Sequence, residues 1–294
     1  MELVVSCSMN DAYLSTHTQP AGQASETVTS RRRYRRALAA LTREGLPFQV
    51  GGAFALEHYI GVARWTKDLD VFIHPRDVSR ALEALAAAGF QTELPYPHWL
   101  GKARAGRDFI DLIFSSGNGV AEVDDEWIAQ GVSGVVIGMP VHLCPPEEMI
   151  WSKAFVAERE RYDGADVAHL IRACHAQMNW DRLLARFGPH WRLLLSHLVL
   201  FDFIYPSERA PRARGMTRAL ARRLAEDGNG HVEQTRVCQG TLLSRAQYLP
   251  DVTAWGYADG RVPPRGRMTE EDVEHWTAAI HDKEEAPDAN RGGG

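Results

Sequence analysis

The chain of 294 residues contains little cysteine and no long apolar run. Its cysteines are far apart and form no CxxC pair: Cys7, Cys144, Cys174 and Cys238. This spacing excludes a compact disulfide framework. No uninterrupted apolar run approaches the roughly 18 residues that a membrane-spanning helix requires, and the first residues lack the basic start and apolar length of a signal peptide. We therefore expect a cytoplasmic protein with reduced thiols and no membrane partner.

A surplus of positive charge is also absent, because the formal net charge is −5. This balance argues against a protein that coats nucleic acid with its whole surface. Two local runs are nevertheless basic, with five arginines within residues 31–36 and six between Arg209 and Arg223. Such runs could bind RNA phosphates, but they are more often solvated helix faces. A nucleic-acid partner is therefore an alternative that the sequence leaves open and does not favour.

The composition is that of a globular protein, with 45% hydrophobic and 24% charged residues, and the pattern changes near residue 145. Before this point short apolar strands alternate with helices, and after it helical periodicity dominates. The predicted fold class is α+β, with a mixed β-sheet and flanking helices in residues 31–145 and a mostly helical domain in residues 146–285. The polar segments 1–30 and 286–294 are expected to be disordered tails.

The expected secondary structure follows from these periods and from capping residues. The predicted strands cover residues 47–50, 66–74, 90–94 and 107–116, with an edge hairpin in 134–144. The predicted helices cover residues 29–45, 53–61, 77–90, 145–177, 191–205 and 216–228. Ser or Thr is expected to cap the first of these helices, Asp77 the third, and Pro145 to precede the long fourth one.

The strand "TKDLDVFIH" at residues 66–74 places two acids on one face. Asp68 and Asp70 alternate with Leu69, Val71 and Ile73, and side chains two residues apart lie roughly 6.5–7 Å apart on the same side of a strand. Two unpaired carboxylates repel at this distance, and a divalent cation between them would remove the repulsion. An acid-x-acid pair alone is weak evidence, because several arise by chance among 38 acids.

Two further features give this pair a context. Gly51-Gly52 lies between a predicted strand and a predicted helix, where paired glycines allow close approach of a phosphate and free helix amides attract it. Asp111 lies in the apolar strand "RDFIDLIF", where an ionised carboxylate is costly unless it is paired or bound to metal. Three carboxylates beside a phosphate-binding turn are what two-metal phosphoryl transfer requires.

With these residues the sequence resembles the DNA polymerase beta-like nucleotidyltransferase superfamily. Its pattern is a Gly-Gly or Gly-Ser turn, a helix, an acid-hydrophobic-acid strand and a third acid on a later strand, here Gly51-Gly52, Asp68-Leu69-Asp70 and Asp111. The most similar branches are small bacterial antibiotic nucleotidyltransferases and the nucleotidyltransferase toxins of toxin–antitoxin systems. The resemblance covers roughly residues 46–170. It departs from many members at Gly52, where a serine hydroxyl would contact the triphosphate.

The resemblance implies roles for these residues. Asp68 and Asp70 would hold two metal ions and the nucleotide phosphates, while Asp111 would hold the catalytic metal and draw the proton of the acceptor hydroxyl toward itself. The same branches carry a lysine-bearing helix followed by an Asp-rich segment. Lys153 could accordingly reach the β- and γ-phosphates, with Asp163 and Asp166 orienting Arg159, Arg161 or the acceptor. A solvated helix face with ion pairs is the alternative for this second cluster.

The function predicted from the sequence is therefore a Mg²⁺-dependent nucleotidyltransferase with two ions that moves a nucleoside monophosphate from an NTP to an acceptor hydroxyl. The acceptor stays open between an antibiotic, a tRNA end and a protein side chain, because the motifs end where the helical half begins. A non-catalytic nucleotide- or RNA-binding module on the same fold is the alternative. The polar segment from Gln239 to Val252 could line the acceptor side of a cleft.

Overall fold

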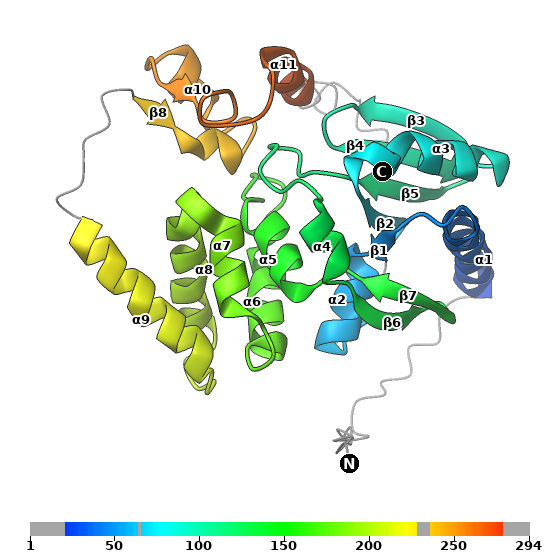
Figure 1. Cartoon of the computed structure of the whole chain (residues 1–294), viewed down its shortest axis with the longest axis horizontal. Coiled ribbons are helices and arrows are strands. Elements are labelled where there is room, and N and C mark those ends of the chain that lie inside the picture. The colour runs from blue at the N-terminus through cyan, green and yellow to red at the C-terminus, as the bar shows by residue number, and fades with distance from the viewer. Residues whose placement is uncertain (1–20, 64–65, 228–235, 279–294) are drawn as a thin grey trace, which may run out of the picture.

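The computed structural model describes residues 21–63, 66–227 and 236–278. Figure 1 shows a β-sheet with its covering helices at one end of the molecule and a group of helices at the other. A smaller C-terminal segment lies over both parts in this view. In the described part of the chain, no helix has the length and apolarity needed to cross a membrane.

The sheet has seven strands in the order β3-β4-β5-β2-β1-β7-β6. They are β1 (Phe48–Val50), β2 (Asp68–Ile73), β3 (Gln91–Tyr96), β4 (Leu100–Ala105), β5 (Asp108–Ile113), β6 (Val132–Val136) and β7 (Met139–Leu143). β2 runs parallel to β5 and β1 parallel to β7, while the other neighbours are antiparallel. The sheet is therefore mixed, as the sequence predicts, and its two central parallel strands carry the acidic motifs.

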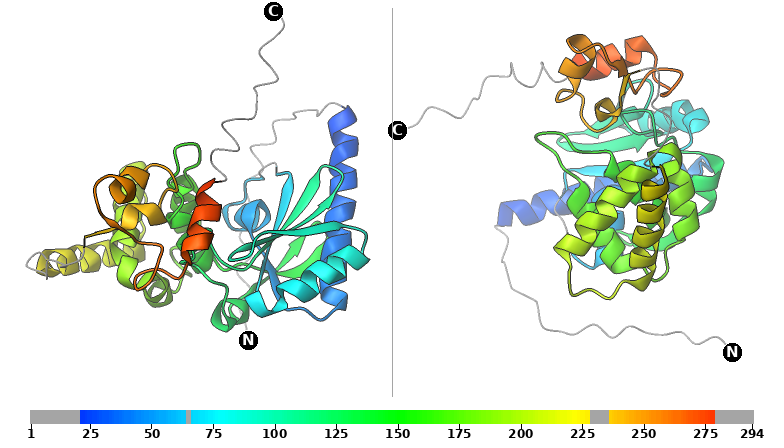
Figure 2. Two further views of the ribbon diagram at one scale, coloured as in Figure 1. Left: turned by 90° about the horizontal axis from the view of Figure 1, so that it is seen from above. Right: turned by 90° about the vertical axis from the view of Figure 1, so that its left-hand side faces the viewer.

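Three helices accompany the sheet: α1 (Ala21–Arg43), α2 (Gly52–Ile60) and α3 (Val78–Ala87). α1 packs against α3 and β5, and α3 packs against β3 and β4, so these two helices lie together along the sheet (Figure 2). α2 contacts β2 on one side and the helical half on the other. Because α2 follows β1 after Gly51, its first turn lies beside the start of β2.

The helical half consists of α4 (Asp125–Ala129), α5 (Pro146–Ala154), α6 (Gly164–Cys174), α7 (Trp180–Phe187), α8 (Trp191–Ile204) and α9 (Pro211–Glu226). α5 packs against α6 and α7, α6 packs against α2 and α8, and α9 packs against α8. One contiguous group of buried apolar side chains runs through both halves, from Tyr34 to Leu242. The predicted boundary at residue 145 thus coincides with a change of architecture. The division into two domains stays a prediction.

The C-terminal segment bridges the two halves. It contains β8 (Val237–Cys238), a 3₁₀ turn (Gln239–Leu242), α10 (Leu249–Thr253), β9 (Ala258–Asp259) and α11 (Glu270–Ala278). The Asn118 side-chain amide donates to the Leu242 carbonyl, and the Ala157 amide donates to the Leu243 carbonyl. α11 packs on β3. Residues far apart in the chain are brought together here, at one edge of the candidate site.

Two helix predictions are corrected by the structure. α1 begins at Ala21, so residues 21–30 are helical where a disordered tail was expected, and residues 1–20 and 279–294 lie outside the described part. Ser30 does not start the helix, and its hydroxyl donates to Asp108 at 2.5 Å. The end of α1 near Gly45 agrees with the prediction, since the Gly45 and Leu46 amides donate to the carbonyls of Thr42 and Leu41.

The single long helix expected over residues 145–177 is wrong, because residues 155–163 separate α5 from α6. Ala157 and Tyr162 form a β-bridge within this interval. The Ala157 amide donates to Leu243, and the Glu158 carboxylate accepts from Ser244 and Arg245. Contacts with the C-terminal segment thus replace the intrahelical bonds that the local sequence favours.

Candidate active site

Three acidic side chains converge at the centre of the sheet. Asp70 on β2 lies directly opposite Asp111 on the parallel strand β5. Asp68 precedes Asp70 by two residues and projects from the same face. One carboxylate oxygen from each of the three lies within 4.8 Å of the others. The predicted convergence is therefore present, and all three side chains are partly exposed.

The glycine turn is built around Asp70. Gly52, the first residue of α2, has a φ of +53°, and a Cβ atom at this position would overlap the Asp70 carboxylate. Gly51 is also confined, since a Cβ there would overlap the Phe72 ring. The Gly51 amide donates to the Asp70 carbonyl at 3.0 Å and is not free to bind phosphate. The first-turn amides of α2, beginning with Gly52, are left for an anion.

A lysine that the sequence analysis did not single out pairs with the third acid. Lys102 on β4 lies opposite Asp111 on β5, and its ammonium group donates to both carboxylate oxygens at 2.8 and 3.0 Å. The strand β4 was not predicted. The turn at Gly106, with a φ of +64°, indicates a two-residue hairpin that places Lys102 opposite Asp111 by register.

The three carboxyl groups differ in their electrostatic surroundings. Desolvation, with repulsion from Asp68 and Asp111, raises the pKa of Asp70 to about 7. Desolvation also raises the pKa of Asp111, although the hydrogen bonds and charge of Lys102 act against it. Thr66 donates a short hydrogen bond to Asp68. Asp70 is thus the carboxylate that most lacks a positive partner, although it lies at the centre of the cluster.

A cavity of about 220 Å³ opens beside Asp70. Gly52, Asp70 and Ile113 belong to its sheet side, and Met149, Lys153 and Arg161 to its helical side. Trp99, Ser115, Ser116 and Asn118 line it from the strand ends, and Thr241 to Arg245 with Trp276 line it from the C-terminal segment. The segment around Gln239 to Val252 therefore does contribute to the cleft.

Two basic side chains on the helical side are held by acids of their own. Lys153 bonds Asp163 at 2.9 Å and pairs with Asp166 at 2.8 Å. Arg161 makes two hydrogen bonds to Asp163, at 3.0 and 2.9 Å. Both cations lower the pKa of Asp70, so their field reaches the acidic centre. An ammonium group has three donors, so Lys153 keeps one after both pairs form.

The C-terminal wall of the cavity is held together by hydrogen bonds and ring contacts. Glu158 accepts from Ser244 at 2.6 Å and from the Arg245 side chain at 2.9 Å. The Arg245 guanidinium lies 4.2 Å from the centre of the Trp276 ring, and Trp276 packs edge-on against Trp99 with ring centres 5.0 Å apart. Aromatic, hydroxyl and charged groups thus form this wall, well suited to an organic molecule with polar substituents.

The acidic centre fits a hard divalent cation. Three carboxylate oxygens close together are the donor set that Mg²⁺ and Mn²⁺ prefer. Lys102 offsets one of the three charges, and the charges of Lys153 and Arg161 are matched by Asp163 and Asp166. Among the described residues no cation forms an ion pair with Asp68 or Asp70, and these two carboxylates, when both are ionised, carry the charge that one divalent ion would neutralise.

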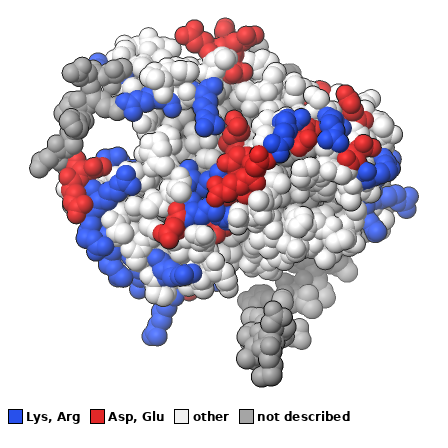
Figure 3. All heavy atoms as spheres, in the orientation of Figure 1, with Lys and Arg blue, Asp and Glu red and all other residues white. Residues whose placement is uncertain are grey.

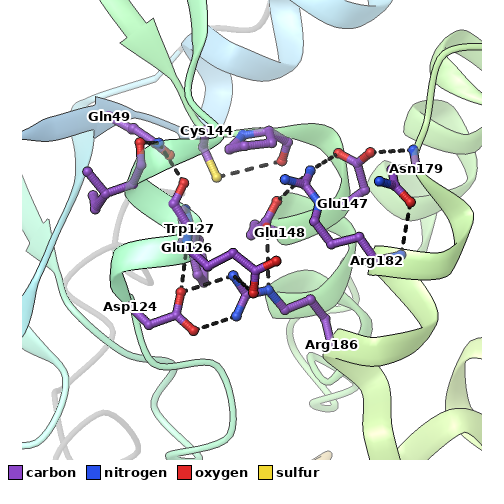
Figure 4. A network of polar contacts seen from close by, with 12 residues as sticks. Gln49, Asp124, Glu126, Trp127, Cys144, Glu147, Glu148, Asn179, Arg182 and Arg186 are labelled. Atoms are coloured by element: carbon purple, nitrogen blue, oxygen red, sulfur yellow. Dashed lines mark hydrogen bonds and ion pairs between the residues drawn. The ribbon is translucent and has the colours of Figure 1, made fainter.

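A second acidic cluster lies between α4, α5 and α7 (Figure 4). Arg182 pairs with Glu147 at 2.7 Å and with Glu148 at 3.3 Å. Arg186 pairs with Glu148 at 3.2 Å and with the more exposed Asp124. Glu148 is fully buried, and desolvation raises its pKa to about 7 in spite of both arginines. This cluster provides its own cations, which is the mark of an internal structural network.

The arginine-rich segment predicted as a solvated helix face or an RNA contact forms α9. Figure 3 shows basic side chains along the edge of the molecule where α9 lies. Arg218 and Arg222 are exposed on this helix, while Arg214 pairs with Asp202 at 3.3 Å. The exposed row agrees with either interpretation, so a nucleic-acid partner stays open.

No protein-family model matches the chain, and no curated protein sequence does. Similar solved structures include the antibiotic-resistance factor ANT(2'')-Ia in solution, with 20% identity over 69% of this chain and 97% of that chain and a TM-score of 0.37. A lincosamide antibiotic adenylyltransferase, LnuA, covers 47% of this chain and 94% of its own at 10% identity and a TM-score of 0.35. A putative nucleotidyltransferase from H. pylori covers 68% and 97% at 14% identity and a TM-score of 0.36.

Identities this low and TM-scores below 0.5 do not decide what this chain does. Its activity is therefore inferred from its own residues. The roles predicted for Asp68, Asp70, Asp111, Gly52 and Lys153 stay predictions, although all five lie at or beside one cavity.

Proposed function

We propose that this chain is a divalent-cation-dependent nucleotidyltransferase that moves a nucleoside monophosphate from an NTP to an acceptor hydroxyl. The observation that carries the proposal is the convergence of three carboxylates within 4.8 Å, beside the glycine-initiated helix α2 and at the end of a cavity with basic residues on its opposite side. In the second cluster each buried carboxylate contacts an arginine. In the part of the chain that the structure describes, no cation forms an ion pair with Asp68 or Asp70.

In the proposed reaction the acceptor hydroxyl oxygen attacks the α-phosphorus. A new P–O bond forms, the bond to the β-phosphate breaks, and pyrophosphate leaves with its electron pair. Asp111 accepts the proton of the hydroxyl group as the oxygen attacks. Asp68, Asp70 and Asp111 would hold the divalent cation, which would supply stabilisation of the negative charge that develops during transfer. The amides at the start of α2 hold phosphate oxygens, and Lys153 and Arg161 attract the leaving pyrophosphate from across the cavity.

The acceptor is proposed to enter from the side formed by the C-terminal segment. Trp276, Arg245 and Ser244 line the cavity there together with Glu158. This wall offers flat apolar surface with hydroxyl and charged groups at its margin. An antibiotic hydroxyl, a tRNA end and a protein hydroxyl remain the three acceptor classes, and the exposed arginines of α9 add weight only to the second.

The test is incubation of the purified chain with each α-labelled NTP, Mg²⁺ and a cell extract, followed by identification of the labelled species. Transfer of label that requires both Mg²⁺ and the intact carboxylates is expected. Parallel reactions with purified tRNA and with a panel of hydroxyl-bearing antibiotics separate the acceptor classes. Absence of transfer from all four NTPs to extract, tRNA and antibiotics would contradict the proposal.

The alternative is a non-catalytic nucleotide-binding module. Such a module needs phosphate-binding amides and cations but has no use for a third carboxylate opposite Asp70. One measurement distinguishes the two functions. A binding module would bind NTP and release it chemically unaltered, whereas an enzyme would release pyrophosphate. Nucleotide binding without any pyrophosphate release in the presence of an accepted hydroxyl compound would favour the module.

A further inference from the structure

Four positions form a row across adjacent strands of the sheet. Lys102 on β4 is in register with Asp111 on β5, which is in register with Asp70 on β2. Glu93 on β3 continues the row beyond Lys102. Directly paired positions on neighbouring strands project to the same face. The ammonium group of Lys102 therefore lies on the far side of Asp111 from Asp70, where it bonds both Asp111 oxygens at 2.8 and 3.0 Å.

Both oxygens of the third carboxylate are thus already used. A carboxylate oxygen can accept more than one bond, but a cation that shares an oxygen with an ammonium group meets its repulsion. Within residues 21–63, 66–227 and 236–278, no cation forms an ion pair with Asp68 or Asp70, and Lys153 and Arg161 act on Asp70 only through their charges. The three acids are consequently unequal as ligands, with two available and one occupied.

The residue type at this position is also informative. The lysines of the chain are Lys67, Lys102, Lys153 and Lys283, so arginine supplies most of the positive charge. Lysine is a compact point charge on a flexible stem, whereas arginine forms a rigid two-pronged pair with a carboxylate. The Lys102 side chain is 28% exposed, and this leaves space toward solvent for it to move. The lysine side chain can therefore move away from Asp111 more easily than an arginine held by a two-pronged pair could.

We propose that Lys102 is an internal counter-ion that occupies Asp111 and makes the two cation positions of the site unequal. This inference rests on the proposed function. Asp68 and Asp70 form a tighter position that needs no rearrangement, and Asp111 joins the second position only when Lys102 yields an oxygen. Lys102 is in this sense a positioning residue. It keeps Asp111 in place in the absence of the second ion and weakens the binding of that ion.

The test measures binding of Mn²⁺ alone to the full chain by electron paramagnetic resonance of the free ion. The wild type is expected to bind one ion with a second at least tenfold weaker. In Lys102→Met, removal of the competing charge is expected to strengthen the second binding by about tenfold or more, since one unit charge near the site is worth at least this much. Lys102→Arg, which keeps the charge, is expected to retain weak second binding.

Two controls separate the outcomes. Arg104→Met removes one positive charge from the same strand, two residues from Lys102. Arg104 contacts Gln91 instead of the acids, so this variant is expected to bind Mn²⁺ as the wild type does. Asp111→Asn is expected to lose the second ion and keep the first. Unchanged second binding in Lys102→Met would overturn the role of Lys102 alone. Failure of the wild type to bind any Mn²⁺ would overturn the inference and contradict the proposed cation-dependent function as well.

Discussion

The two acidic clusters of this protein contain carboxylates with the same raised pKa in opposite surroundings. Desolvation is the largest cause at both Asp70 and Glu148, and each carboxyl reaches a pKa of about 7. At Glu148 the next causes are two arginines that lower the value, whereas at Asp70 they are two further aspartates that raise it. At Glu148 the rise of the pKa that burial causes is partly offset by the arginines. At Asp70 the same rise is reinforced by the like charges of the two aspartates.

This difference separates an internal ion-pair network from the proposed cation site. Arg182 and Arg186 come from α7, and each buried carboxylate of this cluster, Glu147 and Glu148, contacts at least one of these arginines directly. No cation among the residues that the structure describes forms an ion pair with Asp70, and only the more distant charges of Lys153 and Arg161 lower its pKa. Perturbed carboxylates alone therefore do not indicate a function, and the sign of their neighbours decides the interpretation.

The largest expected effect comes from removing the charge of the third acid at the triad. Asp111→Asn keeps the shape of the side chain and removes a charge needed mainly in the transition state. We expect transfer to fall by ~10³ or more, with NTP affinity within a few-fold of wild type. A transfer assay beside an NTP titration measures both. Glu93→Gln removes a carboxylate from the exposed end of the same row as a control, and equal activity of Asp111→Asn and wild type would show that Asp111 is structural.

In the second cluster the expected effect is on folding instead. Arg182→Met leaves Glu147 and Glu148 buried without their main partner, and breaking a buried pair in this way costs about 3–5 kcal/mol. Denaturant unfolding measures the loss. Arg192→Met, which breaks the exposed pair with Asp227, should cost at most about 1 kcal/mol. A similar small cost for both variants would mean that the network contributes no more than surface pairs do.

The glycine turn allows a smaller and more specific test of the triad. In Gly52→Ala the new Cβ would overlap the Asp70 carboxylate at a φ of +53°, so NTP and Mn²⁺ affinity are both expected to fall by about tenfold or more. Gly61→Ala places the same substitution at the other end of α2, with a φ of +71° and no atom within 4 Å of the new Cβ.

Backbone strain should cost each variant about 1 kcal/mol of stability, and Gly52→Ala should lose more because its Cβ also overlaps Asp70. Only Gly52→Ala should lose ligand affinity, which isothermal titration measures. Equal affinities in the two variants would remove the phosphate-binding and Asp70-positioning roles from Gly52.

The smallest expected effect is a pH dependence that separates the clusters. In the metal-free protein the raised pKa of Asp70 lowers stability as the pH rises from about 4 to about 7, because the unfolded chain then holds fewer protons than the folded one. Glu148 contributes with the same sign. Divalent cations bind the ionised carboxylate, so Mg²⁺ should raise Tm by a few degrees more at pH 8 than at pH 6.

Thermal unfolding at both pH values, with and without Mg²⁺, tests this expectation. Glu148→Gln should flatten the pH dependence seen without metal and leave the Mg²⁺ effect intact. Asp70→Asn should abolish the Mg²⁺ effect. Loss of the Mg²⁺ effect in Glu148→Gln would show that the second cluster, and not the triad, responds to the cation.

Much of the site could be predicted from local sequence. The alternation in "TKDLDVFIH" determines that Asp68 and Asp70 share a face, because successive side chains of a strand point to opposite sides. The glycine pair before an apolar helix determines the tight turn at Gly52. The apolar neighbours of Asp111 indicate that its carboxylate needs a partner. These are short-range properties that any fold containing the segments must respect.

The partners of these groups were decided by tertiary structure. Whether Asp111 bonds a metal or Lys102 depends on the register of a hairpin whose first strand, β4, lacks a strong strand pattern. The break at residues 155–163 depends on Glu158 meeting Ser244 and Arg245 more than 80 residues later. A sequence fixes the direction of a side chain through backbone geometry, whereas the charge that it meets depends on which distant strands and helices pack beside it.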